Sequence, residues 1–329
     1  MPILTKSYLN SDAFKAAQLF IESNARPLDL ARFRHHFQQG SVKQVLEELA
    51  RYQNADGGFG NALEPDLRAP DSSAICTSVA FQILGSLAPE VQEGLALPMI
   101  QRGIDYLLHT LDGSMNHWRI IPLEAAHSPR APWWHEGGRA QSFDDFSLNP
   151  TAELLGLLYT YKHFIPDTAR TDILTGLTEK VMTYLAPLEE IEMHDLFCCL
   201  RLGQAANLPP AVAEPLQSIL NRLISNAVET DPAQWQGYGL RPLDVVDEPD
   251  SPFMNGLEEA VAANLNLVIA SQGDNGAWNP NWTWGDFYPE VWSKAQIEWA
   301  GSITVGTLRR LQNFGRLEML RSDAEPIAA

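Results

Sequence analysis

Positive charge is scarce in this 329-residue chain, since 23 Lys and Arg residues face 41 Asp and Glu residues, for a formal net charge of −18. A surface with this balance repels phosphate backbones and anionic lipid headgroups. The composition therefore argues against nucleic acid as a partner. It also disfavours a diphosphate-bearing substrate, unless local Arg or Lys residues overcome the global charge, and it favours small neutral or cationic ligands.

Cysteines are equally few. The three are Cys76, Cys198 and Cys199, and all fall in strongly apolar helical stretches, without the spacing of a disulfide framework or a Cys-x-x-Cys zinc site. Residues 1–20 lack a basic segment followed by an apolar one, and no uncharged apolar run is long enough to span a bilayer. These absences predict a cytoplasmic protein with no transmembrane segment.

Alternating β-branched residues are also scarce, whereas helical patterns fill the chain. Nearly uncharged segments predict inner helices that are buried on all sides; these are residues 73–86, 150–161, 196–206 and 293–311. Segments with one apolar side predict amphipathic outer helices; these are residues 42–49, 100–111, 170–186, 211–228 and 257–272. The two types alternate with a period of about 50 residues, which is typical of a helical-hairpin repeat.

This repeat predicts an all-α fold, an α/α toroid of six helical hairpins that forms a single domain over residues 1–329. The fifth hairpin is expected to be irregular, because Pro232, Pro242 and Pro249 occupy the place of its inner helix and leave room only for a short turn near residues 251–255. We expect the tail, residues 322–329, to be disordered.

A short phrase occurs twice, at the ends of two predicted outer helices. Gln53 is followed by Gly57 and Phe59, and Gln272 is followed at the same spacing by Gly276 and Trp278. The phrase resembles the QW motif of squalene-hopene cyclase and related triterpene cyclases. In those proteins the glutamine caps backbone ends and the aromatic ring stacks beside it, so the resemblance implies a structural role in fastening helices.

A second resemblance covers residues 57–60 and 67–74, which look like the corresponding segment of protein prenyltransferase β subunits. Together these likenesses imply the α/α-toroid superfamily and an isoprenoid-like substrate. The chain departs from both families, because it lacks the Asp-x-Asp-Asp motif of the cyclases, and His194, Asp195 and Cys198 do not match the zinc ligands of the prenyltransferases. We therefore expect neither a metal nor a cofactor.

Candidate catalytic residues follow from the toroid, in which a site is expected at the first turns of the inner helices and in the loops before them. The candidate acids are the carboxyl groups of Glu64, Asp66, Asp145 and Glu298. Glu153 is interpreted instead as a first-turn residue that the helix dipole stabilises, after Asn149 as the cap. For Glu298, catalytic and structural roles remain equally open.

Candidate substrate-binding residues are mainly aromatic, since tryptophans gather in predicted loops, where exposed rings would need a functional reason. Such rings can stabilise a cation or stack on a sugar. Asp195, beside His194, is interpreted as a helix cap. The candidates are Arg68, Trp118, Trp133, Trp134, His194, Trp282 and Trp284.

Three functions are compatible with these residues. The first is a terpenoid cyclase-like enzyme, in which a carboxyl group starts the cyclisation or isomerisation of an apolar isoprenoid-like substrate in an aromatic-lined central cavity. The second is a carbohydrate-active α/α-barrel enzyme, a polysaccharide lyase or glycoside hydrolase, with paired carboxylates and aromatic subsites. The third is a helical module that binds a ligand or partner without catalysis.

Overall fold

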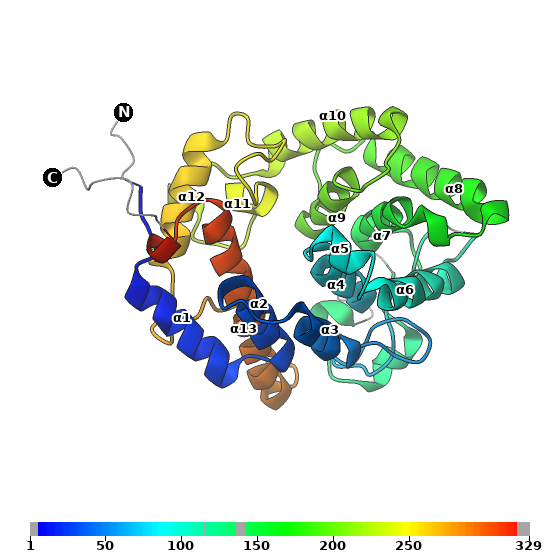
Figure 1. Ribbon diagram of the computed structural model, residues 1–329. Coiled ribbons are helices and arrows are strands. Elements are labelled where there is room, and N and C mark those ends of the chain that lie inside the picture. Colours follow the sequence, from blue (N-terminus) through cyan, green and yellow to red (C-terminus); the bar gives the residue numbers. More distant parts are fainter. Residues whose placement is uncertain (1–5, 115, 136–141, 321–329) are drawn as a thin grey trace. The chain divides into compact units, whose positions relative to one another are not determined.

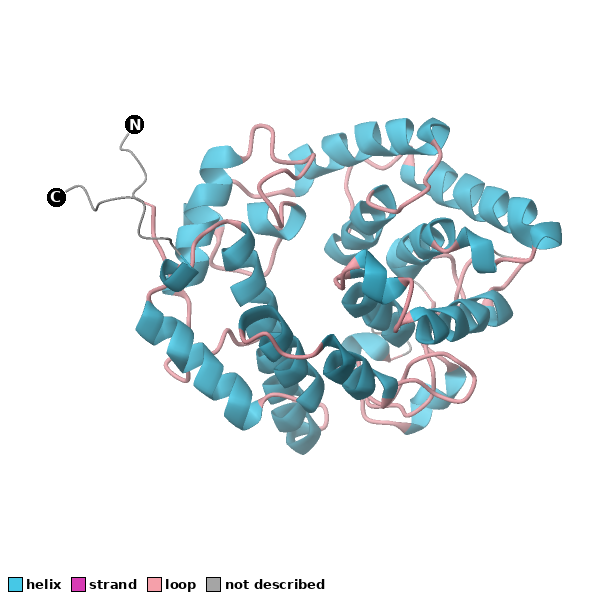
Figure 2. Ribbon diagram, viewed as in Figure 1, coloured by secondary structure: helices cyan, strands magenta, loops and turns pink. Residues whose placement is uncertain are grey.

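The computed structural model describes residues 6–114, 116–135 and 142–320. Within these residues the chain forms thirteen α-helices and five short 3-10 helices, and β-structure is limited to isolated bridges (Figures 1 and 2). The prediction of an all-α protein is confirmed, whereas closure of the hairpins into a toroid stays a prediction. The tail at 322–329 lies outside the described residues. No described helix is both long and apolar enough to cross a bilayer.

The described chain divides into two compact units. Unit 1 contains the described parts of Met1–Ser41 and Ser293–Ala329 together with Val228–Thr283, and unit 2 contains Val42–Ala227 and Trp284–Trp292. The helices of unit 2 are α3 (Val42–Ala50), α4 (Ala74–Gly85), α5 (Pro89–Gln92), α6 (Leu97–Thr110), α7 (Leu148–Thr160), α8 (Asp167–Leu185), α9 (Met193–Gly203) and α10 (Pro210–Ala227). Helix α7 packs against α4, α8 and α9, and α10 packs against α8 and α9.

Helices α4 and α7 form the interior of unit 2, as the scarcity of charge in their sequences predicts. In α4 only Gly85 is exposed, and the N-cap Ser73 accepts a hydrogen bond from the backbone of Cys76 (3.1 Å). In α7, Leu148–Glu153 are all buried, Asn149 has an extended backbone, and the regular helix begins at Pro150. The outer helices α6 and α8 bury one side only. The burial of these four helices follows the sequence pattern, and the alternation of inner and outer helices in a toroid stays a prediction.

Unit 1 contains α1 (Ser11–Asn24), α2 (Pro27–Phe37), α11 (Pro242–Val245), α12 (Glu258–Ala270) and the part of α13 (Pro289–Asn313) from Ser293 onward. Its proline-rich segment is irregular, as expected. Residues 251–255 form turns, and the short helix lies earlier, at α11, because Pro242 occupies a first-turn position where a missing N–H has no cost.

The two copies of the glycine motif make the same contacts, one copy in each unit. The side-chain amide of Gln53 donates to the carbonyl of the motif glycine and to the carbonyl of Met99 (3.0 Å), which joins the end of α3 to α6. The amide of Gln272 donates likewise to its own motif glycine and to Ala13 (2.8 Å), which joins α12 to α1. Both glutamines therefore fasten helices.

The aromatic residues of the two motifs also make matching contacts, and the glycine of the second motif packs closely against a neighbouring helix. The backbone N–H of Phe59 donates to Thr77 Oγ1 on α4 (3.1 Å), and that of Trp278 donates to Thr304 Oγ1 on α13 (3.0 Å). Gly276 has a left-handed backbone (φ +84°), and a Cβ there would lie 2.4 Å from a carbonyl oxygen of α1. The glycine is thus required for close packing and not for a ligand.

Candidate active site

Glu64 and Asp66 lie together in the loop between α3 and α4, just after the first glycine motif. Both side chains are buried, with 7% and 3% of their surface exposed. Before them, the backbones of Asn61 and Ala62 are left-handed (φ 55° and 61°), a conformation that residues other than glycine rarely adopt. The loop is therefore a tightly folded segment that holds two carboxyl groups away from solvent.

Two other segments of unit 2 cover this loop. Leu67 forms an antiparallel bridge with Arg130, and the backbone N–H of Ala131 donates to the Asp66 carbonyl (2.8 Å). From the far end of the sequence, the indole Nε1 of Trp284 donates to Asp66 Oδ1 (2.7 Å). The carboxyl group of Asp66 is thus held in place by the buried indole of Trp284.

The environment of Glu64 favours its neutral form. Burial raises its pKa well above the usual value, and the negative charge of Asp66 raises it further; backbone hydrogen bonds and the Trp134 side chain act in the opposite direction. The Oε2 atom of Glu64 is buried and accepts no hydrogen bond from any residue that the structure describes. Glu64 therefore keeps its proton at pH values where an exposed glutamate has lost it.

Two pairs of aromatic rings adjoin the carboxyl pair, through Trp284 at Asp66 and Trp134 at Glu64. The rings of Trp284 and Trp292 lie 5.5 Å apart and those of Trp134 and Phe143 lie 6.4 Å apart, between centroids, and all four are buried. Arg130 holds together residues 125–134, the segment that covers the loop of Glu64 and Asp66. Its buried guanidinium donates to the backbone carbonyl of Trp134 (2.8 Å) and to those of Ala125, Ala126 and Ser128.

His135 adds a neutral imidazole beside exposed rings. Its ring lies 5.2 Å from that of Phe287 and 6.4 Å from that of Tyr288, and these two side chains are 46% and 41% exposed. Burial lowers the pKa of His135, and the charge of Arg130 lowers it further. Its Nε2 is buried and has no hydrogen-bond partner among the described residues. The signal for this group in the sequence is the run Trp133-Trp134-His135, from which only the two tryptophans were predicted.

The predicted residues Arg68 and Trp133 lie at the edge of this cluster and are half-buried. Arg68 continues the contact between the two loops, because its backbone N–H donates to the carbonyl of Pro129 (3.0 Å), while its guanidinium donates to the carbonyl of Pro65 (3.2 Å). The structure therefore brings together six of the predicted site residues, namely Glu64, Asp66, Arg68, Trp133, Trp134 and Trp284.

Asp145 and Trp118 lie beside Phe143 and make no described contact with the carboxyl pair. Asp145 is exposed and accepts a hydrogen bond from the backbone of Ser142 (3.0 Å), and buried Trp118 donates to the carbonyl of Leu107 (2.8 Å). Both side chains line a surface hollow that has no room for a water molecule. Asp145 therefore lacks the burial that would favour a protonated acid.

Glu298 and Trp282 belong to unit 1. Glu298 is buried at 9% exposure, with the ammonium group of Lys294 3.9 Å from Oε1. The Trp282 ring packs edge-on against that of Trp299, with centroids 5.3 Å apart. Neither indole N–H has a hydrogen-bond partner within the described chain.

His194 lies at the exposed start of α9, where it pairs with Glu192 (2.8 Å). The interpretation of Asp195 as the cap of this helix is wrong. Glu192 is the cap, since its carboxylate accepts the backbone N–H groups of His194 (2.7 Å) and Asp195 (3.3 Å). Asp195 instead accepts the backbone N–H of Asn149 (2.9 Å) and so joins α9 to α7.

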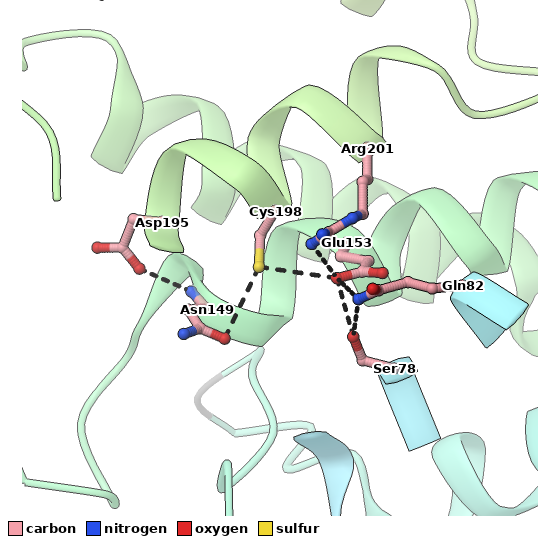
Figure 3. Close-up of polar contacts among 7 residues, drawn as sticks. All are labelled: Ser78, Gln82, Asn149, Glu153, Asp195, Cys198 and Arg201. Atoms are coloured by element: carbon pink, nitrogen blue, oxygen red, sulfur yellow. Dashed lines mark hydrogen bonds and ion pairs between the residues drawn. The ribbon is translucent and has the colours of Figure 1, made fainter. Parts of the chain in front are cut away.

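Glu153 forms a second buried cluster (Figure 3). Its Oε2 accepts hydrogen bonds from Ser78 Oγ (2.8 Å), Gln82 Nε2 (3.3 Å) and Arg201 Nη1 (3.1 Å), and the thiol of Cys198 lies 3.8 Å away. These donors come from α4 and α9, the two helices on either side of α7. Burial raises the pKa of the Cys198 thiol, and the charge of Glu153 raises it further, so the thiol is unreactive.

This cluster joins three helices, α4, α7 and α9, through the side chain of Glu153. The sequence assigned Glu153 to the dipole of its own helix, but the carboxylate is directed to neighbouring helices and paired with a guanidinium. Arg201 compensates the charge of Glu153, and Ser78 and Gln82 donate to the same oxygen, Oε2, so the carboxylate joins α7 to α4 and α9. No group of three or more His, Cys, Asp or Glu side chains in the described chain is arranged to hold a metal ion.

The inference that the loop tryptophans are exposed is wrong for most of them. The loops fold back onto the helices and bury these rings, often with the indole N–H donating to a backbone carbonyl. The buried tryptophans are Trp118, Trp134, Trp235, Trp278, Trp284 and Trp292.

A scan of protein-family models finds no match to this chain, and a search of curated proteins finds none either. The likeness to terpenoid cyclases and protein prenyltransferases stays a prediction from sequence motifs.

Proposed function

We propose that the Glu64–Asp66 pair is the acid centre of an enzyme that acts on an apolar, isoprenoid-like substrate by acid-initiated cyclisation or isomerisation. The carboxyl group of Glu64 carries the proposal, because it is buried, keeps its proton above the usual pH and has one oxygen that no described residue engages. A general acid needs such a raised pKa to hold a proton at neutral pH.

In the proposed step, the O–H bond of Glu64 breaks and its proton adds to one carbon of a substrate double bond, which leaves a carbocation and a carboxylate. Attack by a second double bond then forms a carbon–carbon bond, or loss of a neighbouring proton shifts the double bond. In both cases the final proton returns to the carboxylate. Asp66 and the rings of Trp134 and Trp284 supply negative potential to the intermediate.

A carbohydrate-active enzyme is the second candidate, and the exposed rings of Phe287 and Tyr288 favour it. Exposed aromatic side chains near two carboxyl groups suit a sugar-binding platform. Glu64 would then protonate the glycosidic oxygen, and Asp66 would serve as the base or nucleophile.

The two candidates are separated by offering the protein squalene and soluble oligosaccharides, with products followed by mass spectrometry. Conversion of squalene is expected for the wild type, with loss of turnover but retained binding in Glu64→Gln. Asp145→Asn is the matched control, because it removes an exposed carboxylate outside the pair, and it should keep full activity. Conversion of oligosaccharides alone selects the second candidate. If neither class binds or reacts, or if Glu64→Gln is as active as the wild type, the acid centre is refuted.

A further inference from the structure

Two helices of unit 1, α2 and α13 (labelled in Figure 1), carry a group of basic residues. Helix α13 lies close to the start of α2, since a Cβ at Gly301 would lie 2.8 Å from the Cβ of Ala25, just before α2, and 3.9 Å from Asp29 Oδ2 on α2. Arg32 and His36 follow further along α2, and Arg309 lies two turns beyond Gly301 on α13. The charge of Arg309 acts on both Arg32 and His36, so the three side chains share one region.

The two guanidinium groups of this region have unused donors. Arg309 is half-buried and makes no hydrogen bond or ion pair with any residue that the structure describes. Arg32 pairs with Asp29 through Nη1 (3.1 Å), but its Nε is buried without an acceptor in the described chain. Asp29 also binds Arg26 (2.8 Å), so one carboxylate is shared by two arginines. The remaining acidic neighbour of Arg309 is Asp247, which is exposed.

Positive charge is therefore in excess at this place in an otherwise strongly acidic protein. Burial lowers the pKa of His36 to about 3, and Arg309, Arg32 and His35 add to this effect. Burial and the charge of Arg32 also lower the pKa of Arg309, while Asp247 acts in the opposite direction. Like charges held together away from water are unfavourable unless an anion lies between them.

We infer that Arg32, His36 and Arg309 form a binding site for a phosphate group, carried by inorganic phosphate or by a phosphomonoester. Guanidinium groups donate pairs of hydrogen bonds to phosphate oxygens, and the charge of about −1.5 to −2 on a phosphate monoester at pH 7 matches two arginines. The imidazole of His36 offers a further polar contact. This inference is independent of the proposed function, because these residues lie in unit 1 and the carboxyl pair lies in unit 2.

Isothermal titration of the full chain with inorganic phosphate, glycerol phosphate and acetate tests the site. Saturable binding of phosphate is expected, weakened about 10- to 100-fold by Arg309→Gln, which removes one charged donor set. Arg310→Gln makes the same charge change at the adjacent position of α13 and should leave the affinity unchanged. Tighter binding of glycerol phosphate assigns the ligand as an ester, and equal or weaker binding assigns it as the free ion.

Histidine NMR gives a second readout that a change in folding would not imitate. A bound anion favours the imidazolium form, so phosphate should raise the pKa of His36 in the wild type and in Arg310→Gln, but not in Arg309→Gln. Equal affinities of the wild type and Arg309→Gln, an equal response to acetate, or a His36 resonance that does not respond to phosphate would each overturn the site.

Discussion

Replacing Glu64 with Gln should stabilise the protein as the pH rises, although the change removes a buried carboxyl group. Glutamine has the shape of a protonated glutamate and does not ionise. In the unfolded chain, Glu64 loses its proton near pH 4.5, whereas burial and the charge of Asp66 keep it protonated to a higher pH in the folded protein. Between these two pKa values the unfolded wild type has released a proton that the folded protein still holds.

The size of the effect follows from this single proton. The free energy of unfolding of the wild type falls by about 1.4 kcal/mol for each pH unit within that window, through the contribution of Glu64 alone. Below pH 4.5 both states hold the proton, so this contribution is fully present there. The difference in stability between Glu64→Gln and the wild type should therefore be constant in acid and increase as the pH rises above 4.5.

Urea unfolding at a series of pH values, followed by circular dichroism, measures this difference. The carboxylates that do not interact with Glu64 contribute equally to both proteins and cancel in the comparison. Asp145→Asn removes an exposed carboxylate and should give a curve parallel to that of the wild type. If the curve of Glu64→Gln is also parallel to it, Glu64 ionises in the folded protein as it does in the unfolded chain, and the proposed acid loses its physical basis.

Three further changes should lower the free energy of unfolding, each measured by urea denaturation. Gln272→Ala removes one hydrogen bond to α1 and one within the motif loop, and should cost about 1–3 kcal/mol; a loss below 0.5 kcal/mol, roughly the least expected for one bond, would contradict a fastening role. Gly276→Ala forces a Cβ against a carbonyl in a left-handed backbone and should cost about 1–3 kcal/mol, whereas Gly237→Ala has open space and should cost little. Arg201→Leu leaves the carboxylate of Glu153 buried without its cation and should cost about 1–3 kcal/mol. The cost is less than for a fully buried pair because Arg201 is 38% exposed. An unchanged stability would show that the Glu153 cluster does not hold the three helices together.

The sequence predicted the helices of this protein well because burial leaves a direct mark on a helical pattern. Segments with little or no charge form the buried helices α4 and α7, and segments with one apolar side form α6 and α8, which bury one side only. The irregular segment that contains Pro232, Pro242 and Pro249 was also predictable, since proline removes a backbone donor wherever it stands.

The polar clusters were much less predictable, because their members come from different helices. Nothing in the pattern of α7 indicates that Glu153 meets Ser78 on α4 and Arg201 on α9. The basic group of Arg32 and Arg309 likewise depends on the packing of α2 against α13. Composition alone pointed the other way, since a net charge of −18 gives no sign of a local positive region.

The residues of the glycine motif hold helices together, whereas residues that follow each copy of the motif are available for chemistry. Its two copies make matching hydrogen bonds from glutamine and from the aromatic residue, so these donors are used within the fold. The copies differ in the residues on their C-terminal sides. Glu64 and Asp66 come after the first copy, and Trp284, whose indole binds Asp66, comes after the second. The residues that meet at the candidate site are therefore those that the repeat does not share, and any selective pressure specific to function should act on them and not on the motif.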